Sequence, residues 1–300
     1  MNRPKVTKAV IAAAGFGTRF LPQTKAMPKE MLPIVDKPII QYIVEDLVAA
    51  GIQDIIIVGS SNKRSIEDHF DTPSEDLLVN LRAGGAKKQP YIDEINDVAN
   101  LANFIYVRQK GPYGTGTPIL NVAHLLGNEP FIYAFADDLT IGKPQNIFQQ
   151  MIACYEEFGG HVLPSVRLSD PKAYDMYGVL GGEAVRDDVL KVTDIVEKPG
   201  ADKAPSNFAA VTGYLFLPSV IPYVEAAAGT IEEGTEFYVT TKVIDPMLAD
   251  GEEFYGFEIK GDRYDTGDKL EYVKTVVDFA LQREDIGPAL RDHLQQKLAE

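Results

Sequence analysis

The chain has 300 residues, 45% of them hydrophobic, which is enough for one large domain or two small ones. Its net charge of −15 and the lack of any Lys/Arg block argue against a nucleic-acid-binding protein, because contact with a phosphate backbone needs a basic surface. A single cysteine excludes an intrachain disulfide and fits a cytoplasmic protein, and no apolar run reaches the roughly 18 residues of a membrane helix.

The first part of the chain alternates between strand and helix patterns. Apolar runs predict buried strands, and a periodicity near 3.6 residues predicts the helices between them. The predicted strands are 8–14, 54–59, 104–108 and 130–136, and the predicted helices are 39–50 and 63–70. This alternation favours an α/β fold, a Rossmann-like and mostly parallel sheet covered by helices on both faces. Ligands of such sheets bind at the carboxyl ends of the strands.

The pattern changes twice further along the chain. Residues 71–103 interrupt the alternation and look helical on both sides of a Gly84-Gly85 break. After Phe158 the pattern becomes richer in strands, with short candidates at 162–168, 179–180, 192–196 and 211–217. We interpret this part as a β-rich subregion of the same sheet. The prediction is a single domain, 1–300, made of two halves, 1–158 and 159–267, and of terminal helices within 268–300.

The segment from Ala12 to Pro33 carries the strongest functional signal. A glycine turn, 15–19 with the sequence GFGTR, follows the first predicted strand, and Lys25 and Lys29 come after it. Glycines let backbone N–H groups approach a phosphate closely, and cations offset its charge. The segment lacks the third glycine of GxGxxG and the GK[ST] ending of a P-loop. It therefore predicts a phosphate site of another kind.

This turn and the following PKEMLP, residues 28–33, resemble the signature of the nucleoside-triphosphate:sugar-1-phosphate nucleotidyltransferases. Within that family the chain is most similar to the bacterial UTP–glucose-1-phosphate uridylyltransferases, over nearly its whole length. The resemblance implies the nucleotide-diphospho-sugar transferase fold. It also implies a Mg²⁺-dependent reaction of UTP with α-D-glucose 1-phosphate that gives UDP-glucose and pyrophosphate.

Two alternatives stay open at this point. One is a thymidylyltransferase that uses dTTP, although the resemblance makes such enzymes shorter where this chain has its helical segment 71–103. The other is a catalytically inactive module that binds sugar nucleotides and regulates a partner. Such a module predicts decayed motifs, whereas here the motif residues are in place.

Nucleotidyl transfer depends on positioning and charge, because the nucleophile is already an anionic phosphate oxygen. The glycine turn would hold the β- and γ-phosphates through its N–H groups. Arg19 would bind the leaving pyrophosphate and Lys29 would lie by the α-phosphate, with Lys25 a weaker candidate. An amide such as Gln109 has both the donor and the acceptor that the uracil edge needs. With the resemblance, the predicted nucleotide-binding residues are Ala13, Ala14, Gly15, Gly17, Thr18, Glu30, Gln109 and Gly114.

Two carboxylates in separate parts of the chain are the predicted metal ligands. Asp137 ends the hydrophobic strand FIYAFADD, where a hard oxygen suits Mg²⁺. Asp265 lies in the segment RYDTG, which also follows a strand-like stretch. The resemblance makes these two residues the metal pair. Asp138 departs from the apolar residue expected beside Asp137, and we expect it to be solvated.

The sugar-phosphate site is assigned through the triplet Glu197-Lys198-Pro199. By resemblance, Glu197 accepts hydrogen bonds from the sugar hydroxyls and Lys198, a third catalytic candidate, pairs with the phosphate. The predicted sugar-binding residues are Gly178, Glu197, Lys198, Gly213 and Glu236.

Other features of the sequence say less about function. Cys154 is expected to be a small buried hydrophobe, and the four scattered histidines show no metal spacing. The resemblance further implies a homodimer or homotetramer. The contact is expected at the terminal helices, 270–283 and 289–298. No nucleic-acid or membrane partner is expected.

Overall fold

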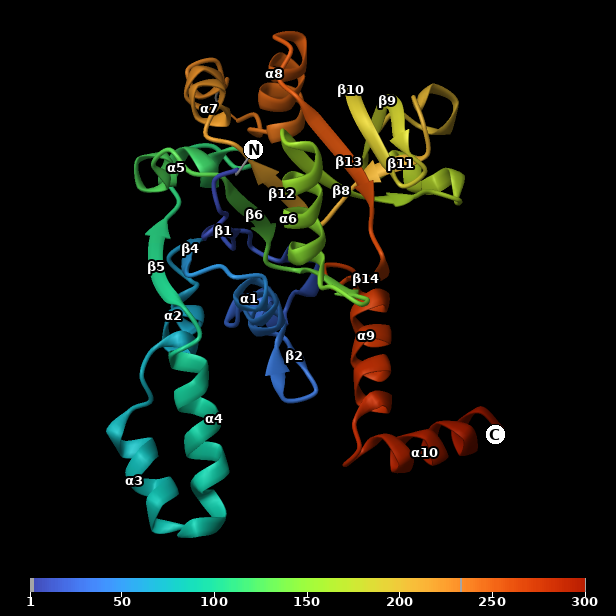
Figure 1. Ribbon diagram of the computed structural model, residues 1–300. Coiled ribbons are helices and arrows are strands. Elements are labelled where there is room, and N and C mark those ends of the chain that lie inside the picture. The colour runs from blue at the N-terminus through green and yellow to red at the C-terminus, as the bar shows by residue number, and fades with distance from the viewer. Residues whose placement is uncertain (1–2, 233, 300) are drawn as a thin grey trace.

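A ten-stranded sheet forms the centre of the molecule, in the order β11-β9-β10-β13-β8-β12-β6-β1-β4-β5 (Figure 1). The computed structural model describes residues 3–232 and 234–299. Within these ranges no helix combines the length and the apolar character that a membrane crossing requires.

The first half of the chain builds the parallel part of the sheet. Its strands are β1 (Lys8–Ala12), β4 (Asp54–Gly59), β5 (Asn103–Arg108) and β6 (Phe131–Phe135). They pair in the order β5-β4-β1-β6, all parallel, with Ala12 opposite Val58 on one side and Phe135 on the other. The four predicted strands are therefore confirmed, and their carboxyl ends meet at one edge of the sheet.

The second half adds mainly antiparallel strands. These are β8 (His161–Arg167), β9 (Gly178–Arg186), β10 (Val189–Glu197), β11 (Phe208–Ala210), β12 (Gly213–Phe216) and β13 (Phe254–Glu258). Only β8 and β13 pair in parallel here. A two-residue turn joins β9 to β10, and strands joined so closely can pair only antiparallel. The α/β class is confirmed, but the sheet is mixed and not mostly parallel. Its parallel pairs are β1–β4, β1–β6, β4–β5 and β8–β13, and its other pairs are antiparallel.

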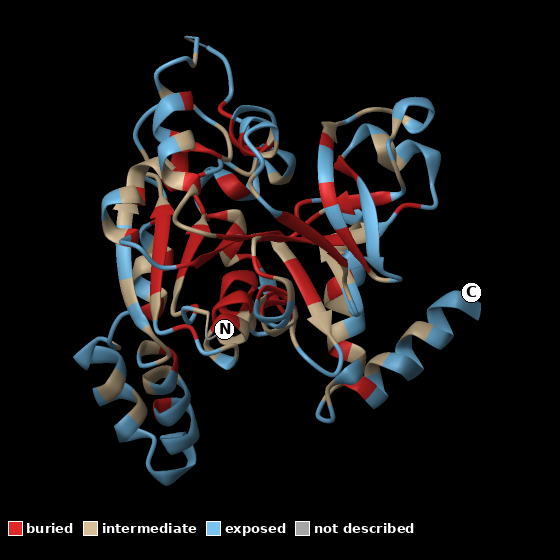
Figure 2. Cartoon of the chain, turned by 45° about the horizontal axis from the view of Figure 1, so that its top comes forward, coloured by how far each residue is buried: buried red, intermediate tan, exposed pale blue. Residues whose placement is uncertain are grey.

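Helices cover both faces of the sheet. One face carries α1 (Ile39–Ala49), α2 (Arg64–Phe70) and α6 (Ile147–Phe158), and the other carries α5 (Thr117–Leu126), α7 (Val220–Ala228) and α8 (Asp245–Ala249). Successive side chains of β1 explain this division, because Ile11 packs with the first group and Val10 with the second. The buried residues accordingly gather on the sheet and on the inner faces of these helices (Figure 2).

Two helical pairs project from this body (Figure 1). The predicted helical interruption is a hairpin of α3 (Glu75–Ala83) and α4 (Gln89–Ala99). The C-terminal arm consists of α9 (Lys269–Gln282) and α10 (Gly287–Ala299). Both are mostly exposed (Figure 2).

Two small antiparallel pairs complete the fold. One joins β2 (Pro33–Ile34) to β3 (Lys37–Pro38). The other joins β7 (Asp138–Gly142) to β14 (Gly261–Asp265), with Asp265 directly opposite Asp138. The second pair brings two distant acidic segments together beside the carboxyl end of β6.

Candidate active site

The glycine turn lies at the carboxyl edge of the parallel strands, directly after β1. Gly17 adopts a left-handed backbone with φ of 63°. A Cβ atom at Gly17 would lie 3.0 Å from Cβ of Lys29 and 3.2 Å from Cγ2 of Thr24. Thr24 also donates a hydrogen bond of 2.8 Å to the Gly17 carbonyl. Only glycine therefore lets the turn pack directly on the segment that carries Lys29.

A buried ion pair between Lys63 and Glu30 anchors the glycine turn. Nζ of Lys63 lies 2.8 Å from a carboxylate oxygen of Glu30, and the two side chains are 3% and 0% exposed. The same ammonium donates a 2.6 Å hydrogen bond to the Gly15 carbonyl. Burial raises the pKa of Glu30 and lowers that of Lys63, and each partner's charge opposes the shift. Glu30 was predicted as a nucleotide-binding residue, and the structure buries it beneath the glycine turn. Lys63 was not predicted, because nothing in its local sequence marks it.

A polar cavity of about 230 Å³ opens between the turn and the acidic segments. It is lined by Gly17, Thr18, Arg19, Phe20, Lys29, Asp137 and Gly267. Lys29 forms an ion pair with Asp137 here. Burial lowers the pKa of Lys29, but Asp137 and Glu30 outweigh it, so the pKa is raised and the ammonium stays charged. Lys25, the weaker candidate, is exposed and does not line this cavity.

The two predicted metal carboxylates converge at Gly267. A Cβ atom there would lie 2.9 Å from Oδ2 of Asp137 and 3.1 Å from Oδ1 of Asp265, with Nη1 of Arg19 at 3.7 Å. Glycine thus keeps open a space that two carboxylates border. Oxygen donors suit Mg²⁺, which proteins often hold with one or two carboxylates plus substrate phosphates. The residues fit such an ion, although the described part of the chain holds no cluster of three or more metal-binding side chains.

A second cavity, of about 200 Å³, continues along the same edge. It is lined by Ala12, Ala14, Gly15, Gln109, Tyr113, Gly114, Thr115, Pro118, Tyr133 and Glu236. The predicted base-binding residues Gln109 and Gly114 are therefore brought together with the end of β1. The structure also places Glu236, predicted as a sugar residue, on this wall. Its carboxylate accepts a hydrogen bond from Tyr238, which raises the pKa of that phenol to about 12.

Close backbone contact explains the glycines of the base loop, residues 111–116. The Phe237 N–H donates to the Tyr113 carbonyl at 2.7 Å, and the Gly116 N–H donates to the Phe237 carbonyl at 2.8 Å. A Cβ at Gly114 would lie 2.4 Å from the Phe237 carbonyl oxygen. The loop is thus pinned to the segment that carries Glu236.

Three of the predicted sugar residues, Gly178, Glu197 and Lys198, lie together at the carboxyl end of β10. The hydroxyl of Thr240 donates a 3.1 Å hydrogen bond to Glu197, and a Cβ at Gly178 would lie 3.2 Å from the same carboxylate. Lys198 adopts a left-handed backbone with φ of 48°, and its side chain is half-exposed. Gly213, with φ of 146°, passes so close to the Tyr133 carbonyl that a side chain would overlap it.

The expectation of a solvated Asp138 is wrong. Its side chain is 11% exposed and accepts hydrogen bonds from Arg263 Nη2 at 2.6 Å and from the Thr212 N–H at 3.1 Å. Nη1 of Arg263 also donates a 3.1 Å hydrogen bond to the Tyr177 hydroxyl. Asp137 lies in the turn between β6 and β7 and lines the cavity, whereas Asp138, the first residue of β7, is buried against Arg263. Burial raises the pKa of Asp138, and Arg263 opposes that shift.

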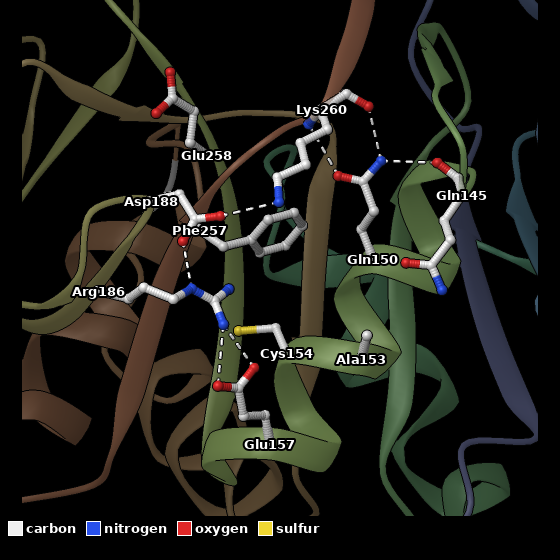
Figure 3. A pocket seen from close by; sticks show the side chains of 10 residues that line it. All are labelled: Gln145, Gln150, Ala153, Cys154, Glu157, Arg186, Asp188, Phe257, Glu258 and Lys260. Atoms are coloured by element: carbon white, nitrogen blue, oxygen red, sulfur yellow. Dashed lines mark hydrogen bonds and ion pairs between the residues drawn. The ribbon is translucent and has the colours of Figure 1, made fainter.

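A separate cavity of about 100 Å³ lies away from this site, beside α6 (Figure 3). It contains Cys154, whose thiol is buried as predicted and has its pKa raised to about 12 by that burial. Its cations are already paired, because Arg186 contacts Asp188 and Glu157 and Lys260 lies 3.2 Å from Asp188.

Comparison with known proteins agrees with this geometry. The sequence model described as "Nucleotidyl transferase" matches residues 8–280. UTP–glucose-1-phosphate uridylyltransferase 1 of Staphylococcus saprophyticus is 41% identical over 278 residues, covering 93% of this chain and 94% of that protein. A UTP–glucose-1-phosphate uridylyltransferase of Bacillus subtilis is 40% identical and covers 98% of this chain and 96% of its own length.

Solved structures of UDP-glucose pyrophosphorylases are also similar to this chain. A UDP-glucose pyrophosphorylase complexed with UDP-glucose superimposes with a TM-score of 0.81 at 34% identity, covering 93% of this chain and 100% of the other. A UTP-bound UDP-glucose pyrophosphorylase from Acinetobacter baumannii superimposes with a TM-score of 0.87 at 31% identity, covering 97% and 99%. The chain therefore belongs to the nucleotidyl transferase family, in the group of the UTP–glucose-1-phosphate uridylyltransferases.

Proposed function

We propose that this protein transfers the uridylyl group of UTP to α-D-glucose 1-phosphate and releases UDP-glucose and pyrophosphate. One observation carries the proposal. The glycine turn that borders the cavity of Arg19, Lys29 and Asp137 also borders the cavity of Gln109 and Gly114. A cationic phosphate site and an amide-lined base site thus share one wall, as a nucleoside triphosphate requires. The names of the uridylyltransferase relatives support UTP as that nucleotide.

The reaction follows from these positions. A phosphate oxygen of glucose 1-phosphate attacks the α-phosphorus of UTP, and the bond from that phosphorus to the bridging oxygen of the β-phosphate breaks. Arg19 stabilises the charge that develops on pyrophosphate, and Lys29 does so at the α-phosphate. Lys198 holds the attacking phosphate, while Glu197 orients the sugar through its hydroxyls. Holding the two substrates in line replaces the need for a general base.

Asp137 and Asp265 would hold Mg²⁺ together with substrate phosphates. When bound, the ion supplies Lewis-acid stabilisation of phosphoryl charge. The nucleotide would be held by the first half, 1–158, and the sugar mainly by residues 159–267.

The first experiment compares triphosphates. Pyrophosphate release is measured with glucose 1-phosphate, Mg²⁺ and UTP, dTTP, ATP, CTP or GTP, with reactions lacking the sugar phosphate as the control. We expect UTP to give the highest kcat/KM, because the base cavity presents an amide to the pyrimidine edge. A preference for dTTP would identify a thymidylyltransferase instead. Absence of release with every triphosphate would favour the inactive regulatory module.

The quaternary structure is a second proposal, a homodimer or homotetramer formed through the C-terminal arm. Leu270 and Val273 on α9 are 62% and 56% exposed, which is unfavourable for apolar side chains that nothing covers. We expect Leu270→Glu/Val273→Glu to lower the mass found by light scattering at micromolar concentration. Val185→Glu, at an exposed position of β9, is the matched control and should leave the mass unchanged. A monomeric mass for the unmodified protein would contradict the proposal.

A further inference from the structure

Two large aromatic rings stand exposed at the entrance to the candidate active site. Phe16 is 52% exposed and Tyr113 is 59% exposed. Their ring centroids lie 5.6 Å apart in an edge-to-face arrangement with an interplanar angle of 61°. Phe16 belongs to the glycine turn and Tyr113 to the base loop. The two loops that border the nucleotide cavities therefore meet at these two rings.

The position of the pair relates it to the nucleoside. Tyr113 lines the base cavity together with Gln109 and Gly114, and Gly15, the neighbour of Phe16, lines the same cavity. On the other side Gly17, also adjacent to Phe16, lines the phosphate cavity. The rings thus stand where the base and ribose of a nucleotide would pass between the two cavities. Large apolar surface kept in water at such a place favours an aromatic ligand.

The backbone of Tyr113 is fixed by a hydrogen bond, whereas its ring is exposed to solvent. The Tyr113 carbonyl accepts the 2.7 Å hydrogen bond from Phe237, whose own side chain is fully buried. The tight approach of Gly114 to Phe237 fixes the next residue as well. The loop therefore presents the Tyr113 ring from a rigid base, which lowers the entropy lost when the ring packs on a ligand.

We propose that Phe16 and Tyr113 form an aromatic clasp that covers the nucleoside of the bound nucleotide, with the Tyr113 ring packed on the base. The identity of that nucleotide rests on the proposed function. Stacking uses the face of a base, which every base offers, so the clasp contributes affinity and not base selectivity. Selectivity stays with the groups that meet the base edge, such as Gln109.

A fluorescence measurement tests the contact without relying on turnover. The chain contains no tryptophan, so Tyr113→Trp introduces a single emitter at the clasp. We expect UTP to change its emission in a saturable way. Tyr91→Trp is the control, because Tyr91 is similarly exposed, at 53%, but lies on the projecting helix α4. Its emission should not respond to UTP.

The Tyr113→Ala variant measures how much the ring contributes to the affinity for UTP. Base–aromatic stacking of about 1–3 kcal/mol corresponds to a roughly 5- to 150-fold increase in the Kd of UTP for Tyr113→Ala. Tyr113→Phe should retain the affinity of the unmodified protein. The same Tyr113→Ala variant should keep the ratio of its affinities for UTP and CTP and its KM for glucose 1-phosphate. A merely structural contact would instead change both KM values and lower the melting temperature.

The outcomes separate the clasp from the proposed function. Turnover of UTP by the unmodified protein, with no emission response of Tyr113→Trp and no loss of affinity in Tyr113→Ala, would overturn the clasp alone. An emission response to triphosphates without turnover of UTP would support the clasp and contradict the proposed function.

Discussion

Replacing either Asp137 or Asp265 by alanine should lower kcat with UTP and glucose 1-phosphate by at least about 10²-fold. Both carboxylate oxygens border the space that Gly267 leaves open, beside Arg19 and Lys29. Loss of either one removes an oxygen donor from the position at which phosphoryl charge develops. The measurement is steady-state pyrophosphate release at saturating Mg²⁺, together with the affinity for Mn²⁺ by electron paramagnetic resonance.

Asp262→Ala is the matched control for this prediction. Asp262 lies on the same strand, β14, as Asp265, but its side chain is 67% exposed and faces Lys143. We expect this variant to keep the kcat and the Mn²⁺ affinity of the unmodified protein. Near-normal turnover in Asp137→Ala or Asp265→Ala would refute the metal assignment.

Lys63→Met should destabilise the fold by about 3–5 kcal/mol, because it leaves the carboxylate of Glu30 buried without its partner. The same change removes the hydrogen bond to the Gly15 carbonyl, so the glycine turn loses its anchor. The free energy of unfolding from urea titration gives the size of the effect. Lys63→Met/Glu30→Leu should recover much of the loss, since no charge is then left buried.

An exposed ion pair provides the comparison. Lys274 and Glu271 on α9 are 2.8 Å apart but 55% and 40% exposed. Pairs of this kind contribute roughly 0–1 kcal/mol, so Lys274→Met should change the free energy of unfolding far less than Lys63→Met. Equal effects of Lys63→Met and Lys274→Met would contradict the role assigned to the buried pair.

The sequence was most informative where local pattern and local structure coincide. The apolar runs of β1, β4 and β6 are buried on both faces, so their hydrophobicity alone marks them as central strands. The glycine turn was recognisable because Gly17 needs its left-handed backbone for a contact only about ten residues away. The same holds for the helical hairpin, whose predicted break at Gly84-Gly85 separates α3 from the turn before α4.

Features that depend on distant partners were not predictable in the same way. Asp138 looked like a surface carboxylate until β7 and β14 paired and placed Arg263 against it. Lys63 acquires its role only when Glu30, 33 residues earlier, is buried beside it. Strand β9 was predicted too short because Gly181 and Gly182 weaken a strand pattern. In the structure a Cβ at Gly182 would lie 2.2 Å from the Lys191 carbonyl, so the glycine is needed for the hairpin.

Among the site residues, too, some were predictable from the sequence and others only from the fold. Arg19 and Lys29 come from one segment and Asp137 from a distant one, and the resemblance to a known family grouped them before the structure placed them around one cavity. Phe16 and Tyr113 carried no such signal, because an exposed aromatic residue in a loop is common and only the fold shows that the two rings meet.

The most direct test of the whole account is the identity of the product. UTP and α-D-glucose 1-phosphate are incubated with the protein and Mg²⁺, and the nucleotides are separated and identified by mass spectrometry. We expect UDP-glucose and pyrophosphate in equal amounts. Formation of UMP and pyrophosphate without UDP-glucose would show hydrolysis of the nucleotide, and recovery of unchanged UTP would show no catalysis. Either result would contradict the proposed uridylyl transfer.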